Sequence, residues 1–246
     1  MLVNRDRMLA RIHASLEKNR AALEAEAARA PHAPPPFVHP PLDDLVTQFA
    51  AELARLDGYP HICPDDEAAL EVIRDILRQH GATSIIAWDL GEIDLPGLDA
   101  LLAELNVALL DGRIAATGDE RAARLQALEP APVCISGADA GIAESGTLLL
   151  LGGAGRGRLA SLLAPVHIAV LRSAQLVRGL GDAFAAIQAR HGPDLFADRS
   201  NLTLITGPSR TADIELTLTL GVHGPREIHV VLIDSAPPDS GRTIEV

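Results

Sequence analysis

Short apolar segments alternate with amphipathic helical segments along most of this chain of 246 residues, and this alternation constrains the fold more than any other feature. The predicted strands are residues 59–63, 83–88, 107–110, 131–136, 147–151, 167–171, 202–206 and 228–233. The predicted helices are residues 43–56, 64–80, 98–105, 119–128, 174–190 and 212–220. Strands separated by helices form parallel sheets that are covered on both faces. We therefore expect residues 42–246 to form a three-layer α/β domain with an open, mostly parallel sheet.

The first 41 residues differ in composition from the rest of the chain. Residues 4–29 are rich in Ala, Arg, Glu and Leu, and Leu9, Ile12, Leu16 and Leu23 share one face of a predicted amphipathic helix. Six prolines between positions 31 and 41 exclude a helix there and predict an extended linker. We expect residues 1–41 to form a helical arm whose apolar stripe packs either on its own domain or on a partner subunit, including a second copy of the chain.

The charged residues exclude several classes of function. Acidic residues outnumber basic ones by 33 to 21, the net charge is −12, and the aromatic residues are only four Phe, one Trp and one Tyr. Nucleic-acid binding needs Lys and Arg clusters, and single-strand binding also needs aromatic side chains, so we expect no nucleic-acid partner. Because Lys18 is the only lysine, the chain cannot form a P-loop, a Schiff base or a pyridoxal-phosphate site.

The cysteines and histidines predict no metal site and no cofactor in this chain. Cys63 and Cys134 are the only cysteines, too few for a four-cysteine iron–sulfur cluster or a zinc ribbon, and we expect them to be buried thiols. The nine histidines show neither H-x-H nor H-x-x-x-H spacing. The apolar runs are shorter than the roughly 18 residues of a membrane span, so we expect a cytoplasmic protein without such a span.

Two turns that follow predicted strands are candidate sites, because ligands of open α/β sheets bind beyond the carboxyl ends of the strands. The first turn is residues 136–147, where Glu144 lies among small residues that let a ligand approach the backbone. Glu144 could act as a nucleophile or general base, or it could hold a backbone amide in a tight turn.

The second turn is residues 206–215. Its backbone amides, the hydroxyls of Ser209 and Thr211 and the guanidinium of Arg210 could hold a carboxylate or phosphate at a helix N-terminus, or the segment could be an ordinary capped helix. His223, in the following segment 221–225, could bring an imidazole to the same edge or could be a turn residue.

A glycine-rich run at residues 152–160 contains the pattern G-x-G-x-x-A. A dinucleotide site would need an acidic residue about 20 positions further on, where the chain has Val177 and Arg178. The two arginines of the run, Arg156 and Arg158, could instead help to hold an anionic ligand.

Three segments of the chain, residues 142–147, 206–215 and 221–225, together with the strand at 228–233, resemble the lactate-utilization (LUD) domain family, and within it the lactate utilization protein C (LutC) subfamily. The resemblance covers about residues 42–235. It implies a fold of the sugar-phosphate isomerase and coenzyme A transferase superfamily. It also implies a subunit of a bacterial system that oxidises L-lactate to pyruvate with two iron–sulfur sister proteins, so that the iron–sulfur clusters belong to these partners. We refer to 142–147, 206–215 and 221–225 as the family segments.

The family segments and the adjoining Gly141 hold the residues that we select as a site, in which this cluster-free chain would bind a small carboxylate or a partner. The candidate catalytic residues are Glu144, Asp213 and His223. The candidate ligand-binding residues are Gly141, Ser145, Gly146, Thr147, Gly207, Pro208, Ser209, Arg210, Thr211, Glu215 and Gly224. Coenzyme A transferases use a glutamate next to a glycine as an acyl nucleophile, and Glu144-Ser145-Gly146 is loosely similar. The alternatives are therefore a self-sufficient enzyme acting on an acyl or phosphorylated small molecule, with Glu144 as nucleophile or base, and a ligand-binding module without turnover.

Overall fold

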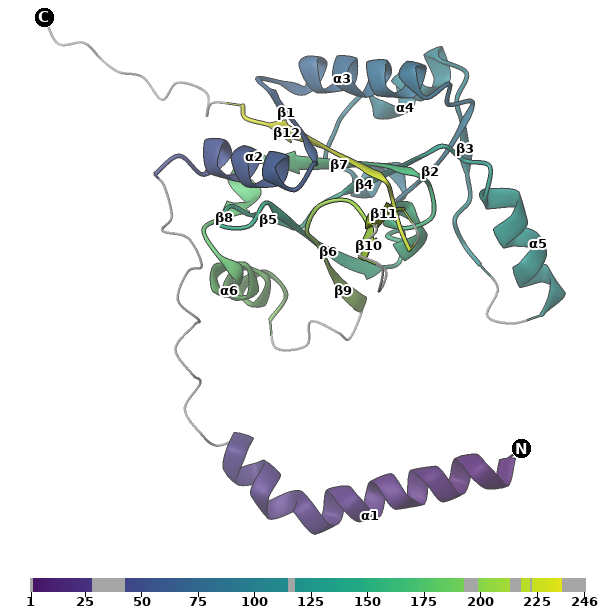
Figure 1. Cartoon of the computed structure of the whole chain (residues 1–246), viewed down its shortest axis with the longest axis vertical. Helices are drawn as coiled ribbons and strands as arrows, with labels where there is room; N and C mark the ends of the chain where they lie inside the picture. Colours follow the sequence, from purple (N-terminus) through teal and green to yellow (C-terminus); the bar gives the residue numbers. More distant parts are fainter. Residues whose placement is uncertain are drawn as a thin grey trace, which may run out of the picture. The chain divides into compact units, whose positions relative to one another are not determined.

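The computed structural model describes residues 2–27, 43–114, 118–192, 199–212, 218–221 and 223–235. The chain forms two units, Met1–Pro36 and Phe37–Val246. The first contains α1 (Leu2–Ala27), a long helix where residues 4–29 predicted one (Figure 1). The predicted boundary between residues 41 and 42 lies outside the described residues. No helix of the described ranges is long and apolar enough to cross a lipid bilayer.

A six-stranded sheet forms the centre of the second unit. Its order is β1-β12-β7-β4-β2-β3, and every neighbouring pair is parallel. The strands are β1 (Tyr59–Cys63), β2 (Ser84–Ala87), β3 (Ala108–Leu110), β4 (Val133–Gly137), β7 (Val166–Arg172) and β12 (Glu227–Ile233). The strands β4, β7 and β12 are buried along almost their whole length, which is why they are continuous apolar runs in the sequence. The predicted α/β fold with a mostly parallel sheet is confirmed.

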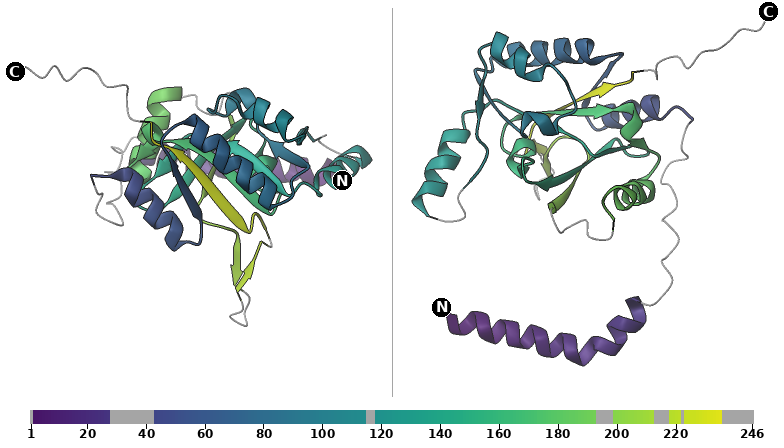
Figure 2. Two further views of the ribbon diagram at one scale, coloured as in Figure 1. Left: turned by 90° about the horizontal axis from the view of Figure 1, so that it is seen from above. Right: turned by 180° about the vertical axis from the view of Figure 1, so that it is seen from behind.

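The helices of this unit are α2 (Leu45–Arg55), α3 (Asp66–Gln79), α4 (Leu98–Glu104), α5 (Asp119–Leu128) and α6 (Leu180–His191), with short 3-10 turns η1 (Leu90–Glu92), η2 (Arg158–Ser161) and η3 (Ser173–Gln175). The carboxylates of Asp44 and Asp65 accept hydrogen bonds from backbone amides of the first turns of α2 and α3, as N-cap residues do. α3 and α4 lie on one side of the six-stranded sheet (Figures 1 and 2).

A second sheet covers the other side of the six-stranded sheet. Its order is β8-β5-β6-β9, formed by β8 (Leu176–Val177), β5 (Ala140–Ile142), β6 (Thr147–Gly153) and β9 (Arg199–Ile205). The side chains of β6 alternate between two cores: Leu148 and Leu150 belong to the main core, and Leu149 and Leu151 pack in a second core with Ala183 and Ile187 of α6. This sheet therefore joins the six-stranded sheet to α6.

The strands predicted at 147–151 and 202–206 exist, but they belong to this second sheet and not to the parallel one. Only residues 143–146 connect β5 to β6. A connection of this length allows an antiparallel hairpin, whereas a parallel crossover needs a dozen residues or more.

The predicted helix at residues 212–220 is wrong. β10 (Arg210–Ala212) and β11 (Leu218–Leu220) pair instead as antiparallel strands. The sequence Leu-Thr-Leu-Thr-Leu at 216–220 alternates with a period of two residues and contains β-branched side chains, which favours a strand. The helix predicted at 174–190 begins only at Leu180, because η3 and β8 occupy residues 173–177.

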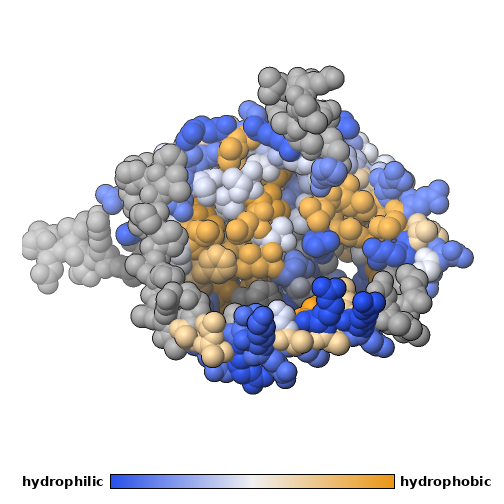
Figure 3. Space-filling model, turned by 60° about the horizontal axis from the view of Figure 1, so that its bottom comes forward, coloured by the Kyte–Doolittle hydropathy of each residue, from blue (hydrophilic) through white to orange (hydrophobic). Residues whose placement is uncertain are grey.

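The burial of β6 and the exposure of its edge neighbour give a matched pair for a stability test. Leu149 is 0% exposed, whereas Leu204, its cross-strand partner on β9, is 42% exposed. Figure 3 shows one face of the molecule, on which hydrophobic residues (orange) are exposed between hydrophilic ones (blue). We expect Leu149→Ala to lower the free energy of unfolding by about 2–5 kcal/mol, because it leaves a cavity between the sheet and α6. Leu204→Ala should change it by about 0.5 kcal/mol. Urea denaturation of both variants checks this, and equal losses would contradict the described packing.

Candidate functional site

The strand order places a topological switch point between β2 and β4. From β2 the chain continues to β3 on one side, then returns to β4 on the other side of β2. The segments that leave the carboxyl ends of these two neighbouring strands diverge, and in open α/β sheets this crevice is where ligands bind. The site is therefore built from the segments that follow β2 and β4.

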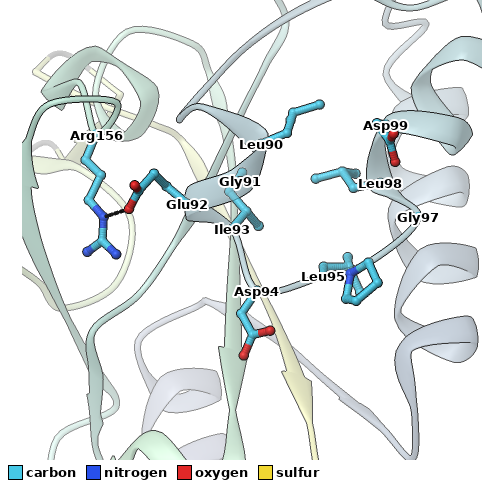
Figure 4. Close-up of a pocket in the computed structure, with 11 residues that line it drawn as sticks. Leu90, Gly91, Glu92, Ile93, Asp94, Leu95, Gly97, Leu98, Asp99 and Arg156 are labelled. Atoms are coloured by element: carbon cyan, nitrogen blue, oxygen red, sulfur yellow. Dashed lines mark hydrogen bonds and ion pairs between the residues drawn. The ribbon is translucent and has the colours of Figure 1, made fainter.

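Arg156 connects these two segments. Its Nε lies 2.7 Å from Glu92 Oε2 in η1, after β2, and its Nη1 lies 2.8 Å from Asp139 Oδ1, after β4. Its guanidinium carbon is 5.0 Å from the ring centroid of Trp88, within cation–π range. Figure 4 shows Arg156 extended toward Glu92. Burial disfavours the charge, but the bonds and charges of Glu92 and Asp139 outweigh it and raise the pKa of Arg156.

Asp139 is held from two directions. Its side chain is 5% exposed, and its second oxygen, Oδ2, accepts a hydrogen bond of 2.7 Å from the Leu151 amide in β6. A buried carboxylate needs such partners, because an unpaired charge in the interior is costly. Asp139 thereby ties the end of β4 to the second sheet and fixes Arg156.

A small enclosed cavity of about 100 Å³ lies at this carboxyl edge. Three guanidiniums and three carboxylates are among its lining residues, which are Trp88, Glu92, Asp94, Gly137, Ala138, Asp139, Arg156, Val170, Arg172, Gln175 and Arg190. A Cβ at Gly137 would lie 3.3 Å from the Trp88 ring, so a larger residue there would crowd the wall. The positive and negative charges of the lining balance. The cavity therefore selects a ligand by how well the hydrogen-bond donors and acceptors of the ligand match those of the lining, and less by the net charge of the ligand.

The other two guanidiniums of the cavity differ in their partners. Arg172 is paired through Nε with Asp94 Oδ2 at 2.7 Å and through Nη1 with Asp66 Oδ1 at 2.9 Å, and the hydrogen bond that Arg172 donates to Asp94 is the main cause that raises its pKa. Within the described part of the chain, Arg190 makes only one hydrogen bond, from Nη1 to the Asp139 carbonyl at 3.4 Å. Arg190 therefore has donors available for a ligand.

Two wider hollows adjoin the cavity. One, of about 620 Å³, is lined by residues 90–99 and Arg156, which are drawn in Figure 4. The other, of about 610 Å³, lies between the ends of β2 and β3 and the glycine-rich loop at 153–157. Gly155 in that loop has φ +72°, and a Cβ there would lie 2.8 Å from Asp89 Oδ2. Trp88, Glu92, Asp94 and Arg156 each line the cavity and one of these hollows.

Glu144 lies at the turn between β5 and β6 and not at this edge cavity. It is buried, its Oε1 accepts a hydrogen bond of 3.1 Å from the Leu180 amide, and its own amide donates to the Arg178 carbonyl at 3.0 Å. The carboxylate thus faces the first turn of α6, where a negative charge is favourable. This is the backbone-holding role that the sequence left open, and a catalytic role of Glu144 stays a prediction.

Gly141, which directly precedes the first family segment, and Gly146 within it allow close packing. A Cβ at Gly141 in β5 would lie 2.6 Å from Leu171 Cδ2. Gly146 has φ +58°, and a Cβ there would clash with the backbone of α2 at Leu53. The hydroxyls of Ser145, Thr147 and Thr206 form a chain of two 2.8 Å hydrogen bonds, which joins the first family segment to the second.

The second family segment is attached to the C-terminal end of α2. Gly207 has φ +77° and lies against Leu56, Pro208 is buried, and Arg210 pairs with Asp57 at 2.5 Å and also bonds the Leu56 carbonyl. Because Arg210–Ala212 is a strand, these residues do not form the helix N-terminus that the sequence predicts as an anion site. Thr211 pairs with Thr219 in the β10–β11 ladder.

The third family segment meets the second through Ser209. Its amide donates to the Pro225 carbonyl at 2.8 Å, its carbonyl accepts from Gly221 at 2.9 Å, and its Oγ accepts from the exposed His223 amide at 3.4 Å. A Cβ at Gly224 would lie 3.4 Å from Ser209 Cβ. Asp213 and Glu215 lie outside the described residues.

The structure thus joins the three family segments to one another, next to the C-terminal half of α2, and builds the edge cavity from other residues. Of the cavity residues, the sequence singled out Arg156, as a group that could hold an anion, and Gly137, Ala138 and Asp139, as part of the candidate turn 136–147. Trp88 ends a predicted strand, Glu92 and Asp94 follow that strand within a few positions, and Arg172 directly follows another. This position after a strand was a usable signal, but only the strand order brings these residues together.

Gly146 and Gly81 form a matched pair that tests the contact between the first family segment and α2. Both have left-handed backbone, at φ +58° and φ +57°, but nothing lies within 4 Å of a Cβ at Gly81. We expect both alanine variants to lose about 1–2 kcal/mol of unfolding free energy to backbone strain. Gly146→Ala should lose about 1–3 kcal/mol more, because its methyl group forces α2 to move. Chemical denaturation measures the difference, and equal losses would contradict this contact.

Comparison with known proteins identifies a family and several relatives of this chain. A family model described as "LUD domain" matches residues 46–233. Lactate utilization protein C of Shouchella clausii is 35% identical over 168 residues, which cover 68% of this chain and 69% of the relative. Lactate utilization protein C of a Geobacillus species is 30% identical over 199 residues, covering 78% of each.

Among solved structures, a DUF162 family protein from Deinococcus radiodurans aligns with a TM-score of 0.54 at 23% identity, covering 77% of this chain and 96% of that one. At this identity the likeness bears on the fold alone.

Proposed function

Because this chain belongs to the LUD domain family, we propose that it is a component of a bacterial lactate utilization system that oxidises L-lactate to pyruvate. The support is the shared name of the relatives, which match over two thirds or more of their length. In this proposal the chain is a cytoplasmic subunit, iron–sulfur sister proteins carry the electrons, and the apolar stripe of α1 contacts a sister subunit or a second copy.

The cysteines support a role without a cluster. Cys63 in β1 and Cys134 in β4 are both buried and unpaired with each other. Burial raises the pKa of the Cys134 thiol to about 11 and also raises the pKa of Cys63. Both thiols are therefore poor nucleophiles at neutral pH. Two separate thiols are also too few for the four thiolates that hold an iron–sulfur cluster.

We propose the edge cavity as the binding place of a small carboxylate such as L-lactate or pyruvate. A volume of about 100 Å³ suits a molecule of a few non-hydrogen atoms. Arg190 has donors available, and a guanidinium binds a carboxylate through two parallel hydrogen bonds. The carboxylates of Glu92 and Asp94 on the same lining can accept the hydrogen bond of a 2-hydroxyl group. The observation that carries this proposal is the guanidinium of Arg190 beside an enclosed polar cavity at the switch point.

Loss of the Arg190 charge should weaken carboxylate binding. We expect Arg190→Gln to raise the dissociation constant for L-lactate or pyruvate about 10-fold or more, because one charge-assisted interaction is lost. Arg55→Gln is the control, since Arg55 is exposed on α2 and pairs only with Glu52 in the described structure. Calorimetry on the isolated chain measures both. If the two variants bind as the unmodified chain does, the carboxylate site is elsewhere.

Reconstitution tests the role in the system. The two anaerobically purified iron–sulfur proteins are assayed for L-lactate-dependent dye reduction, without this chain, with it, and with the Arg190→Gln variant. We expect activity to require the chain and to fall about 10-fold with the variant at low lactate concentration. Equal activity of the partners alone would reject the subunit role.

A second candidate function is an enzyme that acts by itself on acyl thioesters, with Glu144 as nucleophile. Burial of its carboxylate at the start of α6 is the observation that favours it. Incubation with acyl-coenzyme A followed by intact-mass measurement would then reveal an adduct that Glu144→Gln lacks. Glutamine keeps an oxygen that can accept the Leu180 amide, so loss of the adduct would report chemistry and not unfolding. Under the subunit proposal, no adduct forms.

A further inference from the structure

A cluster of histidines lies at the opposite edge of the six-stranded sheet, near the amino ends of β1 and β12. It consists of His61 in β1, Glu227 and His229 in β12, and His80, the C-cap residue of α3. Tyr59 stacks on His229 with ring centroids 4.7 Å apart. We refer to His61, His80, Glu227 and His229 as the histidine cluster. None of its members takes part in the edge cavity or the family segments.

Three ligand atoms of the cluster converge on one point. Glu227 Oε2 lies 3.4 Å from His80 Nε2 and 3.5 Å from His229 Nε2, and the three atoms all lie within 4.8 Å of one another. In a tetrahedral zinc site with bonds of roughly 2.0–2.2 Å, neighbouring ligand atoms are about 3.3–3.6 Å apart. The two distances to the carboxylate therefore already match a metal site.

His80 contributes an atom without a hydrogen-bond partner. Its Nε2 is buried and accepts or donates no hydrogen bond within the described residues. Leaving a buried polar atom unsatisfied costs stability. A cation between His80 and Glu227 would satisfy this nitrogen.

His61 is the hydrogen-bond partner of the second ring nitrogen of His229, a contact that metal-binding histidines commonly have. His61 Nε2 and His229 Nδ1 lie 3.0 Å apart. In the tautomer in which His229 Nδ1 donates to His61, the lone pair of His229 is on Nε2, the atom that faces Glu227. Such a contact fixes the tautomer and orientation of a metal ligand.

The donor set of the cluster can hold a cation, because an imidazole offers a lone pair and a carboxylate offers a negative charge. Glu227 adds a carboxylate that is partly exposed, so an ion can enter from solvent.

We propose that His80, Glu227 and His229 bind a divalent transition-metal ion, with Zn²⁺ as the preferred ion, and that His61 orients His229. Two imidazoles and one carboxylate form a donor set typical of zinc, with a fourth position left for water. The ion would connect the C-terminal end of α3 to β12 across the amino edge of the sheet. No pattern in the sequence indicates this site, because His80 and Glu227 lie 147 positions apart and the ligands share no metal-binding spacing.

Metal titration of the full chain tests this proposal. The protein is stripped with a chelator, then titrated with Zn²⁺ by calorimetry and with Co²⁺ by visible absorption. We expect one equivalent of Zn²⁺ to bind, a tetrahedral Co²⁺ spectrum, and a rise in the melting temperature with Zn²⁺. His80→Ala and Glu227→Gln should each weaken Zn²⁺ binding at least 10-fold, and His61→Phe about 10-fold.

His13→Ala is the matched control, because His13 is an exposed histidine on α1. It should leave the affinity and the Co²⁺ spectrum unchanged. Glu227→Gln is close in shape to the parent residue, so circular dichroism can verify that the variant is folded when binding is lost. The proposal is overturned if the unmodified chain binds no ion, or if the folded His80→Ala and Glu227→Gln variants bind as tightly as it does.

Discussion

The central strands of the parallel sheet must be removed from water on both faces, and the rest of the structure follows from this constraint. β4, β7 and β12 are buried along almost their whole length. α3 and α4 lie on one side, and the four-stranded sheet covers the other. Because that sheet is itself apolar on both faces, α6 must cover it in turn. The successive layers hold the strand ends, and therefore both edges of the sheet, in fixed positions.

Buried charge at the carboxyl edge depends on this arrangement. Asp139 accepts a hydrogen bond from a backbone amide of β6 in the second sheet and forms an ion pair with Arg156. Arg156 also donates a hydrogen bond to Glu92, which follows β2. Each of these charged side chains therefore has an oppositely charged partner, which a buried charge requires. The same network leaves Arg190 with a single long hydrogen bond among the described residues. A polar cavity with balanced charges and an available guanidinium is thus a consequence of how the two sheets are joined.

The family segments lie apart from both the edge cavity and the histidine cluster. The family segments contact one another, the end of α2 and the start of α6 through glycines with left-handed backbone, a chain of hydroxyls, Glu144 and Arg210. The edge cavity and the histidine cluster lie at opposite edges of the six-stranded sheet. A recognisable sequence pattern can therefore mark the scaffold of a family while the polar cavity is formed by residues outside it.

The sequence by itself determined the local elements and the fold class. Continuous apolar runs specified the buried strands, Asp44 and Asp65 marked helix starts, and two separated cysteines excluded a four-cysteine cluster. Only the tertiary structure decided which strands pair, so the sequence assigned residues 147–151 to the wrong sheet. Arg156 was recognisable as an anion-binding candidate, but Glu92 lies 64 positions away from it. The hydrophobic periodicity of a segment shows which of its side chains are buried, but not which distant segments pack against it. The edge cavity and the histidine cluster therefore depend on the strand order, which only the tertiary structure defines.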